Sequence, residues 1–208
     1  MSERQTVVVV DDDDDLRKAL ARLLRGHGYE VKAFDSAEAF LAEQEPSAPA
    51  CLVLDVSLPD LDGLGLQCRL AETGRSCPIV FLTGFGDIPK SVRAIKAGAA
   101  DFLTKPAKAE VLLPALRAAI EQGAARRAAD ADAAVLRARF ESLSERGREV
   151  LDGLAAGKLN KQVAADLGIV EQTVKFHRSR IMRHFAANSA AELMLIAAKL
   201  GLGRERGR

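Results

Sequence analysis

The residues best suited to chemistry in this sequence are carboxylates that directly follow short apolar runs. Asp55 ends the run that begins at Cys51, and Asp11 and Asp12 follow the run Thr6–Val10. Four or five consecutive apolar residues bounded by polar ones are typical of a strand that is buried on both faces. Because ligands bind at the carboxyl ends of strands in open parallel sheets, we expect these three carboxylates to meet at one edge.

Three carboxylates at adjacent strand ends repel one another, and this repulsion predicts a bound cation. Carboxylate oxygens, a backbone carbonyl and water are the ligands that Mg²⁺ prefers. Thr83 and Lys105 stand at the ends of two further short strands that the sequence predicts, and they could bind phosphoryl oxygens. Since an Asp beside a hard cation can attack a phosphoryl group, the pattern favours phosphoryl chemistry at Asp55. Each residue alone has an ordinary structural explanation, but their recurrence at four strand ends favours a shared chemical site.

The elements that must position these residues alternate between strand and helix through residue 106. Strands are expected at 6–10, 29–34, 51–55, 79–82 and 101–104, and helices at 14–27, 37–43, 63–72 and 87–97. Such repeated units with short connections predict a doubly wound parallel five-stranded sheet with helices on both faces. The acids Asp13, Asp14 and Asp15 stand at a helix start, where negative charge is favoured by about 0.3–1 kcal/mol each.

The segment from Lys108 to about Phe140 is Ala-rich and strongly helix-forming. Pro114 and Gly123 interrupt it, so the sequence leaves open whether it is one helix or two. We place a phosphoacceptor domain at 1–122, a linker helix at 123–142 and a small all-α domain at 143–208. The chain's net charge of +1 hides an asymmetry, because residues from Glu141 onward carry a net +4 and the remainder a net −3.

The C-terminal part has the spacing of a helix-turn-helix. Helices are expected at 145–154, 161–167, 171–185 and 190–200, the second capped by Asn160. Ala164, Gly168 and Val174 fit the inner face and the turn of such a pair, although a plain αα-hairpin would show the same spacing. Basic residues crowd the second helix of the pair; they are Lys175, Arg178, Arg180 and Arg183. A solvated face explains any one of them, whereas the cluster favours DNA contact.

Several segments of the first half together resemble the receiver domain of bacterial two-component response regulators. They are 9–13 (VVDDD), 55–63 (DVSLPDLDG), 83–84 (TG) and 105–106 (KP). The resemblance implies a flavodoxin-like strand order and makes Asp55 the phosphoacceptor. It implies that Asp11, Asp12, Asp55 and the Ser57 backbone carbonyl hold Mg²⁺. It also assigns switch roles to Thr83, Phe102 and Lys105, and implies a cis Lys105–Pro106 peptide.

Segments of the second half resemble the LuxR-type domain of NarL/FixJ-type response regulators. They are 143–146 (LSER), 149–151 (EVL), 160–164 (NKQVA) and 173–178 (TVKFHR). The residues expected at DNA are Asn160, Lys161, Thr173, Lys175, Phe176, His177, Arg178 and Ser179. Asn160 and Lys161 would lie near phosphates, and the last helix would pair two subunits. Val170 stands where a capping Ser is common, and we expect this to cost the recognition helix about 1 kcal/mol.

The leading hypothesis is therefore a cytoplasmic response regulator of the NarL/FixJ type. It would take a phosphoryl group from a sensor histidine kinase, bind double-stranded promoter DNA and form a homodimer when phosphorylated, with RNA polymerase as a further candidate partner. Release of a masked DNA-binding domain remains an alternative to dimerisation. No stretch approaches the roughly 18 apolar residues of a membrane span, and Cys51, Cys68 and Cys77 are expected to be small buried hydrophobes.

Two other functional classes compete with this hypothesis. An Mg²⁺-dependent phosphatase that uses an aspartyl phosphate would also place a carboxylate at a strand end. Such enzymes typically need a second acid two residues after the nucleophile, and Ser57 occupies that position. The other class is a phosphate-carrying interaction module with a degenerate tail, which the intact cluster from Lys175 to Arg183 disfavours.

Overall fold

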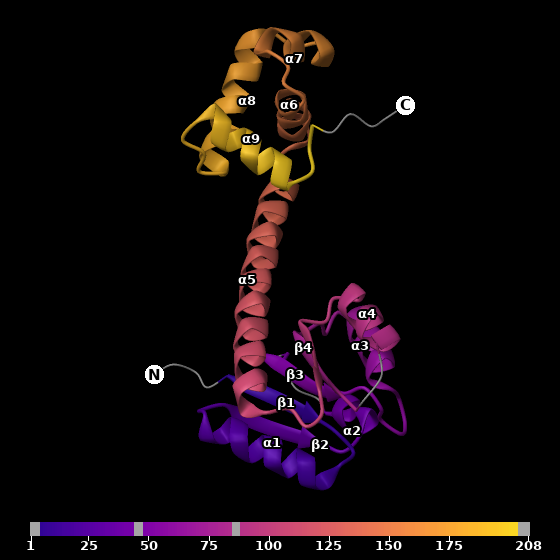
Figure 1. Ribbon diagram of the computed structural model, residues 1–208. Coiled ribbons are helices and arrows are strands. Elements are labelled where there is room, and N and C mark those ends of the chain that lie inside the picture. The colour runs from indigo at the N-terminus through magenta and orange to yellow at the C-terminus, as the bar shows by residue number, and fades with distance from the viewer. Residues whose placement is uncertain (1–4, 44–47, 85–87, 204–208) are drawn as a thin grey trace. The chain divides into compact units, whose positions relative to one another are not determined.

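Figure 1 shows the computed structural model of the chain, which describes residues 5–43, 48–84 and 88–203. The chain divides into two compact units, Met1–Arg126 and Arg127–Arg208. This division falls inside the segment 123–142 that the sequence suggested as a linker. The domain boundaries at 122 and 143 stay a prediction.

The first unit contains the doubly wound parallel sheet that the sequence predicts. Its strand order is β2-β1-β3-β4-β5, and every neighbouring pair is parallel. The strands are β1 (Thr6–Val10), β2 (Glu30–Phe34), β3 (Cys51–Asp55), β4 (Ile79–Thr83) and β5 (Asp101–Thr104). The helices between them are α1 (Asp14–Gly26), α2 (Ala37–Ala42), α3 (Gly63–Glu72) and α4 (Ile88–Lys96). The expected start of the last helix at Asp87 lies outside the described residues.

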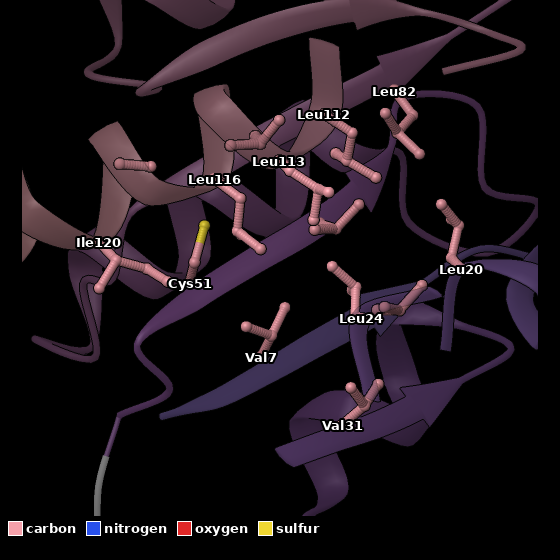
Figure 2. Close-up of a cluster of buried hydrophobic side chains, with 14 of the residues drawn as sticks. Val7, Leu20, Leu24, Val31, Cys51, Leu82, Leu112, Leu113, Leu116 and Ile120 are labelled. Carbon is pink, nitrogen blue, oxygen red and sulfur yellow. The ribbon is translucent and has the colours of Figure 1, made fainter. Parts of the chain in front are cut away.

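Helices cover both faces of this sheet, and each face has its own apolar core. Figure 2 shows one of these cores, in which Leu24 of α1 and Leu112, Leu116 and Ile120 of α5 pack against Val7 and its strand neighbours. The core on the other face joins side chains of α2, α3 and α4 to the same strands. Strands covered on both faces show no polar alternation, which is why β1, β3 and β4 appear in the sequence as continuous apolar runs.

The segment that contains Pro114 and Gly123 forms one continuous helix, α5 (Ala109–Glu141). The sequence had left open whether it is one helix or two. Pro114 lies inside the helix and is exposed, so the carbonyl that loses its backbone donor can be hydrated. Leu112, Leu113 and Leu116 are buried on either side of it. Packing of these leucines on the sheet outweighs the local preference of proline, because burying each side chain contributes about 1.5–3 kcal/mol.

The second unit is all-α. Beyond the end of α5 it contains α6 (Glu145–Ala155), α7 (Asn160–Leu167), α8 (Glu171–His184) and α9 (Ala190–Lys199). One core joins these helices; among its buried members are Leu151, Val163, Val174 and Leu193. Gly168 ends α7 with φ of +64°, a left-handed conformation that glycine adopts without strain. The pair α7–α8 is thus a helix-turn-helix whose turn lies where the sequence placed it.

Two expectations about this part of the fold and about the cysteines are wrong. Asn160 does not cap α7, because the helix already begins there and Leu159 is the N-cap residue. The Gln162 side chain takes over the capping role by accepting the Leu159 N–H at 2.8 Å. Cys51 is buried, but Cys77 is half-buried and Cys68 is exposed on α3, so only one of the three is a buried hydrophobe.

Candidate functional site

The register of the sheet brings the predicted site residues to one edge. Leu54 pairs with Val10, so Asp55 lies at the level of Asp11, the residue that follows β1. Thr83 is the last residue of β4 and pairs with Thr104, which Lys105 follows. The carboxyl ends of four adjacent strands therefore present two carboxylates, a hydroxyl and an ammonium, as the sequence predicts.

A cluster of three carboxylates lies at the centre of this edge. Ligand oxygens of Asp11, Asp12 and Asp55 are all within 4.8 Å of one another. Asp11 is 1% exposed and Asp55 5%, whereas Asp12 is exposed to solvent. Two buried acids and one open acid form a set compatible with a hard cation such as Mg²⁺, which binds few carboxylates and keeps several waters.

Lys105 joins this cluster through two ion pairs. Its Nζ lies 2.8 Å from Oδ2 of Asp11 and 2.9 Å from Oδ2 of Asp55. Burial raises the pKa of Asp11, an effect that the hydrogen bond and charge of Lys105 only partly oppose. Burial alone would lower the pKa of Lys105, but hydrogen bonds and charges from the two carboxylates outweigh it and raise that pKa. Lys105 is thus held as a cation against the acids.

Backbone donors fix the orientation of both buried carboxylates. The N–H of Asp13 donates to Oδ1 of Asp11 at 3.0 Å, and the N–H of Ser57 donates to Oδ1 of Asp55 at 3.2 Å. Each acid therefore uses one oxygen for its own loop and turns the other toward Lys105. Ser57 itself is exposed, two residues beyond the end of β3.

The remaining acids of the N-terminal run have the structural role expected of them. Asp13 is the N-cap of α1, and its side chain accepts the N–H groups of Asp15 and Leu16, both at 3.0 Å. Asp14 and Asp15 lie in the first turn, where Asp14 pairs with Arg17 at 2.7 Å. These contacts separate the two site acids, Asp11 and Asp12, from the three that serve the helix.

Thr83 and Phe102 lie beside the cluster. Thr83 is 3% exposed, and its carbonyl accepts the Lys105 N–H at 2.6 Å. The Lys105–Pro106 peptide is cis, as the resemblance implied. Phe102 on the edge strand β5 is partly buried, and its ring centroid lies 5.9 Å from that of the fully buried Phe81. The backbone bond thus joins Thr83 to Lys105, and the ring contact joins Phe102 to Phe81 on the neighbouring strand.

Gly63 has a role at the site that the sequence analysis did not assign. A Cβ at this position would lie 2.4 Å from the backbone oxygen of Asp55 and 3.1 Å from Cα of Val56. Only a glycine lets the start of α3 lie so close to the loop that follows Asp55. The available sequence signal was a glycine that follows Asp62 at a helix start. A side chain is usually tolerated at such a position, so this glycine did not indicate a close approach of two backbone segments.

The second candidate site is the surface of α8. Lys175, Phe176 and Ser179 are exposed there, whereas Thr173, His177 and Arg178 are half-buried. A groove of 670 Å³ beside α8 is lined by four of the predicted contact residues, Asn160, Lys175, Arg178 and Ser179. The groove also includes Arg183, a member of the basic cluster that the sequence predicts on this helix. The four others, Lys161, Thr173, Phe176 and His177, lie outside the groove lining.

Contacts between these side chains already organise the α8 surface. The Asn160 side-chain oxygen accepts a long hydrogen bond of 3.4 Å from Arg178, which links α7 to α8. The guanidinium of Arg180 lies over the Phe176 ring, 5.6 Å from its centroid. Lys175 forms an ion pair of 2.9 Å with Glu171, an acid that the sequence analysis did not single out. The four-residue spacing of Glu171 and Lys175 was the available signal.

Each of the two candidate sites lies in a region that matches a known family. Residues 7–117 match the model of the response regulator receiver domain, and residues 141–197 match that of bacterial regulatory proteins of the luxR family. The chain is a two-component response regulator. It belongs to the NarL/FixJ type, in which a receiver domain is joined to a LuxR-type DNA-binding domain.

Relatives of this response regulator match nearly its whole length. Nodulation protein W of Bradyrhizobium diazoefficiens is 46% identical over 201 residues, which cover 97% of this chain and 88% of the relative. The transcriptional regulatory protein FixJ of Rhizobium meliloti is 41% identical over 198 residues, covering 95% and 97%. One of these two relatives is thus named a transcriptional regulatory protein, and both match this chain over nearly its whole length.

Solved structures agree with this placement. The response regulator StyR is 43% identical, with a TM-score of 0.79 over 94% of this chain and 99% of that one. Full-length FixJ from B. japonicum is 39% identical, with a TM-score of 0.58 over 95% and 97%.

Among the described residues of the response regulator, no helix is both long and apolar enough to cross a membrane.

Proposed function

We propose that Asp55 accepts a phosphoryl group from a sensor histidine kinase and that this transfer controls DNA binding by α8. The ion pair between Asp55 and Lys105 within the acid cluster carries the proposal. Asp55 is the residue of the cluster that combines a strand-end position with neighbours on both sides, Asp11 on β1's side and Thr83 on β4's side.

In the proposed transfer, the Asp55 oxygen turned toward Lys105 forms a bond to phosphorus while the bond to the donor nitrogen breaks. Asp11, Asp12, Asp55 and the Ser57 carbonyl would hold Mg²⁺, which when bound would neutralise charge on the phosphoryl oxygens. Lys105 follows the new negative charge, because a phosphoryl oxygen replaces the carboxylate oxygen as its partner. Thr83 donates its hydroxyl hydrogen to another phosphoryl oxygen.

The transfer can be tested by intact-mass measurement on the full chain incubated with Mg²⁺ and a small-molecule phosphodonor. Wild type should gain the mass of one phosphoryl group, and Asp55→Asn should gain none. Asp13→Asn is a matched control, because Asn also caps helices and the Asp13 side chain bonds only to the first turn of α1. A phosphoryl group that is retained in Asp55→Asn would refute the assignment of Asp55.

A phosphatase would use the same nucleophile, but we propose that this chain is a regulator without turnover of external substrates. The position two residues after Asp55 holds the exposed Ser57 in place of the second acid that such enzymes use. Without an acid at that position, no side chain there can protonate a leaving group, as general acid catalysis requires. Phosphatase assays on small phosphomonoesters should therefore give no rate that depends on Asp55.

For the C-terminal unit we propose that α8 enters the major groove of double-stranded DNA. The net positive charge of the unit and the exposed Lys175, Phe176 and Ser179 support this docking. Asn160 and Lys161, at the start of α7, would position the DNA backbone. The regulator would act in the cytoplasm, with promoter DNA and RNA polymerase as its partners there.

The two units are coupled, in this proposal, through the β5 edge of the sheet. A phosphoryl group on Asp55 draws Thr83 toward it, and Phe102, which contacts Phe81, then has space to turn inward. Such a change would favour one of two alternative side-chain packings of this face. Phosphorylation switches generally act by shifting an equilibrium of this kind. We propose that the altered face pairs two receivers, so that two copies of α8 reach two half-sites together.

A further inference from the structure

Helix α8 carries one acid on a strongly basic surface. Its fourteen residues include Lys175, three arginines and two histidines, and Glu171 is the only carboxylate. Oε1 of Glu171 lies 2.9 Å from Nζ of Lys175, and the two side chains are 45% and 55% exposed. The side chain expected to read bases is therefore paired with a carboxylate before any DNA arrives.

Helix stability alone explains part of this arrangement. A Glu four residues before a Lys stabilises a helix by about 0.2–0.5 kcal/mol, and an acid in the first turn interacts favourably with the helix dipole. On a surface that approaches phosphates, however, the same carboxylate repels the DNA backbone and offsets the charge of Lys175. Its effect on binding is thus opposite in sign to its effect on the helix, so the two can be measured separately.

We propose that Glu171 is a specificity-determining residue that keeps Lys175 from neutralising phosphates at non-specific DNA. On a mismatched sequence Lys175 keeps its ion pair with Glu171 and contributes little to backbone binding. On the correct sequence the O6 and N7 acceptors of a guanine replace the carboxylate as partners of Lys175. Glu171 thereby lowers non-specific affinity more than specific affinity. The inference rests on the proposed docking of α8 in the major groove.

The chain offers a matched control for this ion pair. Arg146 and Glu149 form a pair of 2.8 Å on α6, with side chains 43% and 42% exposed. Its length and exposure resemble those of the Glu171–Lys175 pair, its spacing is three residues in place of four, and α6 is not part of the helix-turn-helix pair. Glu149→Gln therefore removes one exposed helical carboxylate and the same unit of charge without touching Lys175.

The test measures dissociation constants against KCl concentration for the full chain with Mg²⁺ and a phosphodonor. Two duplexes serve as probes, one selected from a random library by wild type and one of scrambled sequence. Glu171→Gln should tighten binding to the scrambled duplex by up to about fivefold, the range that an exposed ion pair is worth. The slope of log K against log salt should steepen by about 0.9, because Lys175 then releases one more counterion.

Binding to the selected duplex should change less, so the ratio of the two affinities should fall in Glu171→Gln. Glu149→Gln should leave slope and ratio at their wild-type values. In a Lys175→Ala background, Glu171→Gln should leave the ratio of the two affinities unchanged, because direct repulsion of phosphates by Glu171 acts on both duplexes alike. An equal fall of the ratio in the two Glu→Gln variants, or a fall that persists without Lys175, would overturn the role of Glu171. A wild-type chain with no preference between the duplexes would instead overturn the proposed docking of α8 itself. Comparable melting temperatures of the two variants verify that neither has lost its fold.

Discussion

Nζ of Lys105 lies 2.9 Å from Oδ2 of Asp55 and 2.8 Å from Oδ2 of Asp11. One cation thus bridges the acids at the ends of two neighbouring strands, in the place where the proposed phosphoryl group would enter. The bridge has two consequences. It offsets the repulsion between buried carboxylates, and it competes with any divalent cation for the same oxygens.

This competition predicts that Lys105→Ala binds Mg²⁺ more tightly than wild type does, because a positive charge next to the metal ligands has been removed. Asp12→Ala should do the opposite, since it removes a ligand. The measurement is the rise in melting temperature with Mg²⁺ concentration, which reports the dissociation constant by mass action.

Controls for both variants come from neighbouring residues. Lys108→Ala removes an exposed lysine, and Asp15→Ala removes an exposed acid in the first turn of α1. Both should keep the wild-type response to Mg²⁺. If Asp12→Ala showed the full wild-type shift, the metal ligands would have to be sought elsewhere.

The raised pKa of Asp11 predicts how Mg²⁺ binding depends on pH. A metal ligand must be deprotonated, so protons compete with the cation. Because burial raises the pKa of Asp11 above its usual value of 3.8, affinity should begin to fall at a higher pH than for ordinary aspartates. The check is Mg²⁺ titration at several pH values. In Asp11→Asn, whose amide does not titrate, the remaining affinity should lose this component of the pH dependence.

Parallel topology explains how much of the site could be predicted from the sequence. Once β1, β3, β4 and β5 are recognised as apolar runs, the residues at their carboxyl ends must share one edge, whatever the details of packing. The ion pairs of Lys105 could not be predicted in this way. They depend on the loop after β5, and several side-chain rotamers would have kept the lysine in solvent.

Local preferences misled the sequence analysis where tertiary or nearby side-chain contacts replaced them. Asn160 is a good N-cap residue by type, but Gln162 provides a cap one residue earlier, at Leu159. Pro114 and Gly123 left open whether α5 is continuous, and burial of Leu112 and Leu116 favours continuity across Pro114. Sequence patterns identified the elements in these cases, and long-range or competing contacts decided their ends.

The close approach of α3 to the site loop predicts that Gly63→Ala destabilises the protein by about 1–3 kcal/mol, the usual cost of overpacking. The added Cβ would lie 2.4 Å from the Asp55 backbone oxygen, so β3 or α3 has to shift. Denaturant unfolding measures the loss. Gly26→Ala is the control, because a Cβ there meets nothing within 4 Å and the site ends a helix. It should be neutral or slightly stabilising.

The proposed division between base and phosphate contacts predicts different consequences for two lysines. Lys175→Ala should flatten the preference among DNA sequences, because a base contact carries about 1–3 kcal/mol of discrimination. Lys161→Ala should weaken binding to all sequences alike and make the salt slope shallower by about 1. Binding to a panel of single-base variants of the selected duplex separates the two. Identical changes in preference would contradict the division.

We propose that phosphorylation of Asp55 controls dimerisation and, through it, DNA binding. The most direct test measures molar mass by light scattering, together with affinity for the selected duplex, with and without a phosphodonor. Wild type should become dimeric and bind DNA more tightly when the phosphodonor and Mg²⁺ are present, and Asp55→Asn should do neither. A phosphodonor-induced dimer that persists in Asp55→Asn would contradict the claim. A wild type that gains DNA affinity while staying monomeric would replace dimerisation with release of a masked DNA-binding domain.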